Sequence, residues 1–202
     1  MRVLPLSTNL SEPNLDHDVF VYPTDTCYGI GCSALDETAL KRVYEAKGRD
    51  FNKPVNLMVD SLEMLEHYGE LSPTARKLAE TFLPGDFTLL LPRKDVLPSF
   101  VNPDQEPIGL RIPDHTFCLA LVETIGAPVV TTSANVAGQP ETYSLPDILQ
   151  AFGEDNANID LVFDGGVLKK NPPSTIVKVI GDSWEIVRQG RIRPEDIEKA
   201  LA

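Results

Sequence analysis

Three cationic residues gather in one short segment of a chain whose formal net charge is -12: Lys47, Arg49 and Lys53 lie within seven positions. The helix predicted for residues 37–47 ends there and Pro54 stops regular structure. We therefore expect all three on loop backbone outside the core, where their side chains can converge. Arginine offers a planar fork of donors and lysine a mobile charge, which together suit a compact polyanion such as a triphosphate. The segment also fits a solvated cluster of surface charges.

A second polar group follows the apolar residues "PVV" in the segment "TTSANVAGQP", residues 131–140. Thr131, Ser133 and Asn135 offer hydroxyls and an amide where the predicted strand ends, together with backbone N–H groups. Open α/β sheets usually bind ligands at such strand ends. The segment therefore predicts part of a binding site, with a capped turn as the structural alternative.

A third group combines cations and hydroxyls in or beside predicted strands. Arg111 lies inside the apolar strand "PIGLRIP", where an unpaired charge is costly. We expect it to meet the carboxylate or phosphate of a ligand, or to form an internal salt bridge with one of the 30 acidic residues. Ser174 enters a strand whose predicted partner carries Arg188. Thr26 leaves another strand, and the nearby Gly29 lets the backbone approach a ligand closely unless the segment is only a turn.

Strands and helices alternate along the chain, which predicts a layered α/β domain. Strands are expected over residues 18–24, 54–60, 87–92, 107–113, 128–135 and 159–166, an antiparallel pair over 174–180 and 183–190, and helices over 37–47, 71–83, 116–126, 145–153 and 193–202. Because two strands pair late in the chain, we expect a twisted, mixed open sheet flanked by helices. No dinucleotide-binding or P-loop glycine motif is present in the sequence.

Composition limits the class of protein. With 202 residues, 42% of them apolar and 24% charged, the chain is expected to form one domain over residues 1–202. No apolar run approaches the ~20 residues of a membrane span and no signal pattern opens the chain, so a cytoplasmic location without membrane contact is expected. The three cysteines form no C-x-x-C pair, which supports neither a disulfide framework nor a zinc site. The net charge of -12 argues against broad binding of nucleic acids, whose phosphates are also negatively charged.

Seven segments in order resemble the YrdC/TsaC family of threonylcarbamoyl-AMP synthases: "YPTDTCYGIG", "AKGRDFNKP", "FLPGDFTLLLP", "GLRIPDH", "TTSANVAGQP", "PSTIVKV" and "IVRQG". The resemblance covers roughly residues 19–192. It implies a twisted mixed α/β sheet with a large concave cavity. It also implies that the enzyme condenses L-threonine, bicarbonate and ATP into threonylcarbamoyl-AMP and pyrophosphate, with Mg²⁺ on the phosphates. A partner transferase complex then modifies tRNA with the product, so weak or no direct tRNA binding is expected.

The resemblance also assigns site residues. It implies a catalytic role for Lys47 and Arg49. The residues implied to bind ATP are Lys47, Arg49, Lys53, Ser133, Asn135 and Arg188, and those implied to bind threonine are Thr26, Arg111, Thr131 and Ser174; no resident metal site is implied. Two positions depart from the family pattern: Met58 stands where some relatives have a histidine near threonine, and Glu141 where some have a serine near ATP.

Two alternative functions stay open at this stage. The first is an RNA-binding or RNA-maturation module of the same fold, which would bind RNA phosphates without making an adenylate. The second is an enzyme that forms a carbamoyl-adenylate on another amine. Salt-sensitive tRNA affinity without ATP turnover would mark the first, and indifference to threonine the second.

Overall fold

A mixed sheet of ten strands runs through the part of the chain that the computed structural model describes, residues 1–103 and 107–202. The strands are β1 (Arg2–Pro5), β2 (Phe20–Pro23), β3 (Tyr28–Ser33), β4 (Asn56–Met58), β5 (Phe87–Leu91), β6 (Ile108–Arg111), β7 (Val129–Ser133), β8 (Leu161–Asp164), β9 (Thr175–Ile180) and β10 (Ser183–Arg188). The helices are α1 (Glu37–Lys47), α2 (Leu62–Tyr68), α3 (Pro73–Phe82), α4 (Thr116–Ile125), α5 (Leu145–Phe152) and α6 (Pro194–Leu201).

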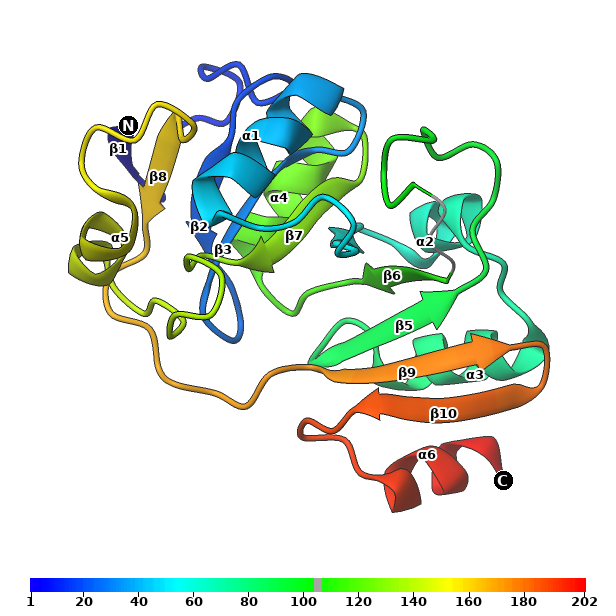
Figure 1. The fold of residues 1–202 in the computed structure, drawn as a ribbon. Coiled ribbons are helices and arrows are strands. Elements are labelled where there is room, and N and C mark those ends of the chain that lie inside the picture. The colour runs from blue at the N-terminus through cyan, green and yellow to red at the C-terminus, as the bar shows by residue number, and fades with distance from the viewer. Residues whose placement is uncertain (104–106) are drawn as a thin grey trace.

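The strand order is β1-β8-β2-β3-β7-β4-β6-β5-β9-β10, so the first and last strands form the two edges and the termini lie at opposite ends of the molecule (Figure 1). Neighbours such as β4 and β6 are parallel, whereas β3 and β7 are antiparallel. The predicted mixed α/β sheet is confirmed, as is the antiparallel pair β9 and β10. The sequence analysis missed β1, β3 and α2.

Local sequence fixes the helix boundaries that matter for the site. Asp36 caps α1, because its carboxylate accepts hydrogen bonds from the backbone N–H groups of the first turn. The helix ends at Lys47 because Gly48 adopts the left-handed conformation, with φ of 56°, which favours glycine. The helix predicted over residues 71–83 is α3, which begins at Pro73 with Ser72 as its N-cap.

The two faces of the sheet are covered unequally. One face packs Val19, Val21, Ile30 and other apolar residues against α1, α3 and α5 in the larger core. The other face packs Phe20 and Tyr22 against α4 in a smaller core. The smaller core extends as far as Met58 and Val129 and leaves the neighbouring residues of β4 and β7 uncovered.

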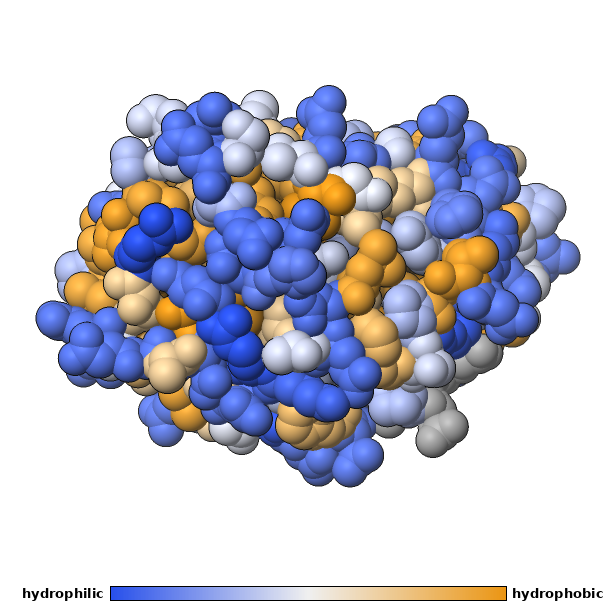
Figure 2. All heavy atoms as spheres, turned by 90° about the horizontal axis from the view of Figure 1, so that it is seen from above, coloured by the Kyte–Doolittle hydropathy of each residue, from blue (hydrophilic) through white to orange (hydrophobic). Residues whose placement is uncertain are grey.

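Hydrophilic residues cover most of the molecular face shown in Figure 2, with apolar residues exposed between them in smaller groups. No helix in residues 1–103 and 107–202 is long and apolar enough to cross a membrane.

Candidate active site

The floor of the candidate site is a row of residues that face each other across five neighbouring strands. Pairing aligns Gly31 of β3 with Thr131 of β7, Thr131 with Asn56 of β4, Asn56 with Gly109 of β6, and Gly109 with Leu90 of β5. The glycine on β6 leaves necessary space, because a Cβ atom there would lie 2.1 Å from Asn56 Oδ1. Thr131, Asn56 and Leu90 of this row line a cavity of about 400 Å³.

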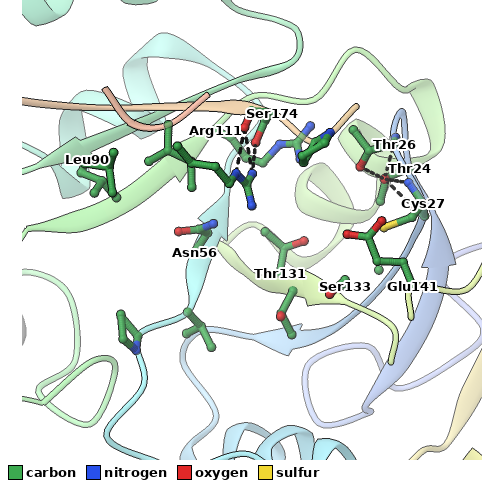
Figure 3. A pocket seen from close by; sticks show the side chains of 18 of the residues that line it. Thr24, Thr26, Cys27, Asn56, Leu90, Arg111, Thr131, Ser133, Glu141 and Ser174 are labelled. Atoms are coloured by element: carbon green, nitrogen blue, oxygen red, sulfur yellow. Dashed lines mark hydrogen bonds between the residues drawn. The ribbon is translucent and has the colours of Figure 1, made fainter. Parts of the chain in front are cut away.

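Loops and strand ends surround the floor and bring polar groups to the cavity (Figure 3). The side chains come from segments far apart in sequence: the β2–β3 connection, the α1–β4 connection, and the ends of β6, β7, β9 and β10. The predicted site residues that line the cavity are Thr26, Arg49, Arg111, Thr131, Ser133, Ser174 and Arg188. Lys47, Lys53 and Asn135 are not among its lining residues.

Lys47 lies in a different place from the one predicted. It is the last residue of α1 and is only 2% exposed, so the expectation of loop backbone outside the core is wrong for this residue. Its ammonium donates hydrogen bonds to the backbone carbonyl oxygens of Ser133 and Asn135, the second over 2.8 Å. Burial, and after it the charge of Arg49, lowers the pKa of Lys47 to about 8. Lys47 therefore stabilises the turn after β7 through these hydrogen bonds and does not line the cavity.

Arg49 lies on the connection after α1, as predicted, and lines the cavity. Its guanidinium donates to the carbonyl oxygen of Pro54 over 2.8 Å, while its buried Nε–H has no acceptor among the described residues. Lys53 is exposed, and its carbonyl oxygen accepts a hydrogen bond from the Tyr44 hydroxyl. The three cations therefore do not converge on one point, and Arg49 is the one whose guanidinium reaches the cavity.

Ser133 and Asn135 are joined by a hydrogen bond of 2.6 Å from the serine hydroxyl to the amide oxygen. The amide nitrogen of Asn135 donates to the carbonyl oxygen of Gln139 over 2.6 Å. Asn135 thus shapes the turn, and Ser133 presents the polar surface of that turn to the cavity.

Arg111 forms an internal salt bridge, which was one of the two predicted alternatives. Its Nη2 lies 2.7 Å from both carboxylate oxygens of Asp25, and the two side chains are 11% and 10% exposed. The salt bridge forms because the β2–β3 connection places the carboxylate of Asp25 at the end of β6. The buried Nε–H of Arg111 nevertheless has no acceptor among the described residues.

Arg188 and Ser174 meet across the strand pair β9 and β10, as expected. The guanidinium donates to the Ser174 carbonyl oxygen and, over 2.9 Å, to its hydroxyl oxygen. The same hydroxyl lies 3.0 Å from that of Thr88. Loss of solvent, and then the neighbouring Arg111 charge, lower the pKa of Arg188. Two guanidinium groups therefore lie on this side of the cavity, where either can contact an anionic ligand.

The remaining predicted threonine contacts, Thr26 and Thr131, also face the cavity. The Thr26 hydroxyl lies 3.2 Å from that of Thr24. The hydroxyl of the fully buried Tyr22 donates to Thr131 Oγ1 over 2.8 Å. Because that oxygen already accepts a hydrogen bond, the Thr131 proton is free to point into the cavity.

Sequence analysis missed Tyr22 and Asn56 as contributors to the site. Asn56 carried a signal, since it is a polar residue within the apolar run "PVNLMVD". Tyr22 carried none, because an aromatic residue in a strand is ordinary. Of the two departures from the family pattern, Met58 is 1% exposed in the smaller core, whereas Glu141 lines the cavity and accepts a hydrogen bond from the Tyr143 hydroxyl.

Within the described residues, neither the cysteines nor a group of metal-ligating side chains forms a further candidate site. Cys27, Cys32 and Cys118 are free and buried. No group of three or more His, Cys, Asp or Glu side chains that could hold a metal ion occurs in residues 1–103 and 107–202.

The fold and sequence match known proteins over most of the chain. A threonylcarbamoyl-AMP synthase of Pyrococcus abyssi is 34% identical over 89% of this chain, and a Methanocaldococcus jannaschii relative is 36% identical over 91% of it. This chain spans 52% of the first relative, about half its length, and 84% of the second.

A solved structure gives the same result in three dimensions. The crystal structure of P. abyssi Sua5 complexed with L-threonine superposes with a TM-score of 0.83 at 33% identity, covering 92% of this chain and 54% of that one. The family model named for Sua5, YciO and YrdC, and described as "Telomere recombination", matches residues 15–190. This match takes in every residue that lines the cavity. The chain therefore belongs to the Sua5/YciO/YrdC family.

Proposed function

We propose that this chain synthesises threonylcarbamoyl-AMP from L-threonine, bicarbonate and ATP, releasing pyrophosphate. The observation that carries the proposal is that two guanidinium groups, those of Arg49 and Arg111, line one cavity. A guanidinium has five N–H donors, more than the hydrogen bonds that either arginine forms among the described residues, so further donors can bind an anionic ligand. Because these donors come from two separate segments, the cavity suits two anionic groups. Relatives named threonylcarbamoyl-AMP synthase support this identification of the ligands.

Arg49 and Ser133 would bind the ATP phosphates, with the mobile side chain of Lys53 reaching over from the exposed loop. Lys47 would add positive charge from behind the turn that carries Ser133, and Asn135 would hold that turn in shape. Among the predicted ATP-binding residues, Arg49 and Ser133 would thus contact the phosphates directly, whereas Lys47 and Asn135 would support the turn that carries Ser133.

Arg111, Thr26, Thr131 and Ser174 would bind the amino acid, with Arg111 on its carboxylate or carbamate. Arg188 would contact the nucleotide from β10, where it also orients the Ser174 hydroxyl. The guanidinium groups of Arg111 and Arg188 would hold a carbamate formed from threonine and bicarbonate.

The chemistry requires alignment and charge neutralisation. An oxygen of the carbamate attacks the α-phosphorus of ATP, a new P–O bond forms, and the bond to the departing pyrophosphate breaks. Charge accumulates on the phosphate oxygens, where arginine and backbone donors stabilise it. No side-chain nucleophile is needed for this reaction, which agrees with three cysteines that are buried and whose pKa values are all raised by burial.

Magnesium would enter on the phosphates of ATP. Glu141 brings a carboxylate to the cavity, and Mg²⁺ at nucleotide sites is usually bound by one or two carboxylates together with the phosphates. A partner transferase would then pass the threonylcarbamoyl group to tRNA. The RNA-binding alternative is not favoured, since the chain carries a net charge of -12 and its relatives are named as synthases.

The test is a pyrophosphate-release assay with ATP and bicarbonate, in which L-threonine, L-serine and no amino acid are compared. Release that depends on both threonine and bicarbonate is expected. Release that ignores the amino acid, or no release at all under conditions where a family member is active, would refute the proposal.

A further inference from the structure

The side-chain amide of Asn56 is a polar group in the cavity to which neither the sequence pattern nor the proposed reaction assigns a task. Asn56 opens β4 and lines the cavity, with its side chain partly exposed. No group in residues 1–103 and 107–202 forms a hydrogen bond with the amide. The amide is therefore available to a ligand in the cavity, which would replace the water around it.

The position of Asn56 is fixed by the sheet rather than by a loop. It pairs with Thr131 on one side and Gly109 on the other, about 4.8 Å away across each strand interval. Arg111 lies two residues beyond Gly109 on the same face of the sheet. In Figure 3 the Asn56 side chain lies beside Thr131, with Arg111 and Ser174 above the two. An amino acid held by Arg111 would therefore extend over Asn56.

The polar groups next to Asn56 present hydrogen-bond donors that suit an anion. Thr131 accepts a hydrogen bond from Tyr22 and so has a proton left to donate. Ser174 likewise accepts from Arg188. These hydroxyls and the guanidinium of Arg111 offer donors, which suits a carboxylate or carbamate. The Asn56 amide differs because it offers a donor and an acceptor together. That combination matches a hydroxyl, which also donates and accepts.

Resting on the function proposed above, we propose that Asn56 is the specificity-determining contact for the β-hydroxyl of L-threonine. Leu90 lies beyond Gly109 in the same row of the sheet and supplies an apolar neighbour for the β-methyl group. The two substituents of the threonine β-carbon are then met by chemically different side chains on the floor of the cavity.

The test compares L-threonine with L-2-aminobutyrate, which has the same carbon skeleton without the hydroxyl. Pyrophosphate release is measured for the wild type and for Asn56→Leu, a change that keeps the number of side-chain heavy atoms and the branch at Cγ and removes both hydrogen-bonding groups. We expect kcat/KM for threonine to fall about 10- to 100-fold in the variant, while that for 2-aminobutyrate changes less than about 3-fold. Equal losses for both substrates would overturn the assignment, because a merely structural role affects both alike.

Calorimetric binding of the two amino acids separates this inference from the proposed function. If the wild type binds threonine but releases no pyrophosphate, the function fails. The assignment of Asn56 then stands only if Asn56→Leu loses the preference for threonine over 2-aminobutyrate. A wild type that binds neither amino acid overturns both. Asn9→Leu makes the same chemical change at an exposed position outside the cavity and should keep the wild-type preference. Asn56→Ser serves as the second variant if leucine disturbs folding, and it is expected to weaken the preference in the same direction.

Discussion

Lys47 Nζ donates a hydrogen bond to the backbone carbonyl oxygen of Asn135 over 2.8 Å, which joins residues 88 positions apart in the chain. The same ammonium also donates to the carbonyl oxygen of Ser133. A lysine at the end of a helix usually extends into solvent, yet this one is 2% exposed. The end of α1 and the turn after β7 are therefore joined into one structural unit, of which Ser133 lines the cavity and Lys47 does not.

Replacing Lys47 with methionine should destabilise the fold. The substitution keeps the apolar stem but leaves two carbonyl groups without their donor in a buried place, so we expect the free energy of unfolding to fall by about 2–4 kcal/mol. Urea denaturation near neutral pH measures the change. Lys41→Met is the matched control on the same helix, since the Lys41 side chain is 55% exposed and pairs with Glu37 at the surface. The control should shift stability by less than about 0.5 kcal/mol, and a Lys47→Met as stable as the wild type would contradict this role.

The pH dependence of stability should reveal the depressed pKa of Lys47. Its pKa falls from 10.5 to about 8 on folding, mainly through burial. Between these values the unfolded chain binds more protons than the folded one, so the contribution of Lys47 to stability rises with pH across this window. Relative to Lys47→Met, the wild type should gain about 1–2 kcal/mol between pH ~7.5 and ~9.5 in urea titrations. A difference that stays constant or falls would mean that Lys47 keeps its proton in the folded state.

Much of the fold could be predicted because the apolar periodicity of most elements agrees with their place in the sheet. Strand β3 escaped prediction because Gly29 and Gly31 weaken its strand pattern. Space explains Gly31, since a Cβ atom there would lie 1.8 Å from the carbonyl oxygen of Val130. At this position the strand carries glycine in place of the β-branched residues that make strands easy to recognise.

The site could be predicted only where a residue breaks its local pattern strongly. Arg111 did so, because a charge within an apolar strand is costly, but its partner Asp25 is 86 positions away and could not be identified from the sequence. Asn56 broke the pattern weakly, since a neutral amide costs less to bury. Lys47 was misplaced because its acceptors are backbone carbonyls of a distant turn, and backbone groups leave no mark in the sequence.

Removing the Tyr22 hydroxyl should weaken threonine binding. Tyr22→Phe frees Thr131 Oγ1 from its donor, so the Thr131 proton is no longer directed toward the cavity. We expect KM for threonine to rise about 3- to 10-fold, with kcat changed less than about 2-fold. Tyr28→Phe is the matched control on the adjacent strand, because its hydroxyl bonds Gly165 and Gly166 rather than a cavity residue. If both variants raise KM equally, general loosening of the sheet explains the effect and the role of Tyr22 is wrong.

Arg49 and Lys53 should differ sharply in their effect on ATP use, although they lie four residues apart. Arg49 lines the cavity, whereas Lys53 is exposed and must fold over to reach a phosphate. Arg49→Ala should lower kcat/KM for ATP about 100- to 1,000-fold, and Lys53→Ala about 3- to 10-fold through KM. Arg49→Lys should recover only a small part of the loss, because a lysine restores the charge without the planar fork. Steady-state pyrophosphate release, with urea denaturation to confirm folding, measures all three variants. The outcome that contradicts this ranking is a larger loss for Lys53→Ala than for Arg49→Ala, which would place the triphosphate on the exposed loop outside the cavity.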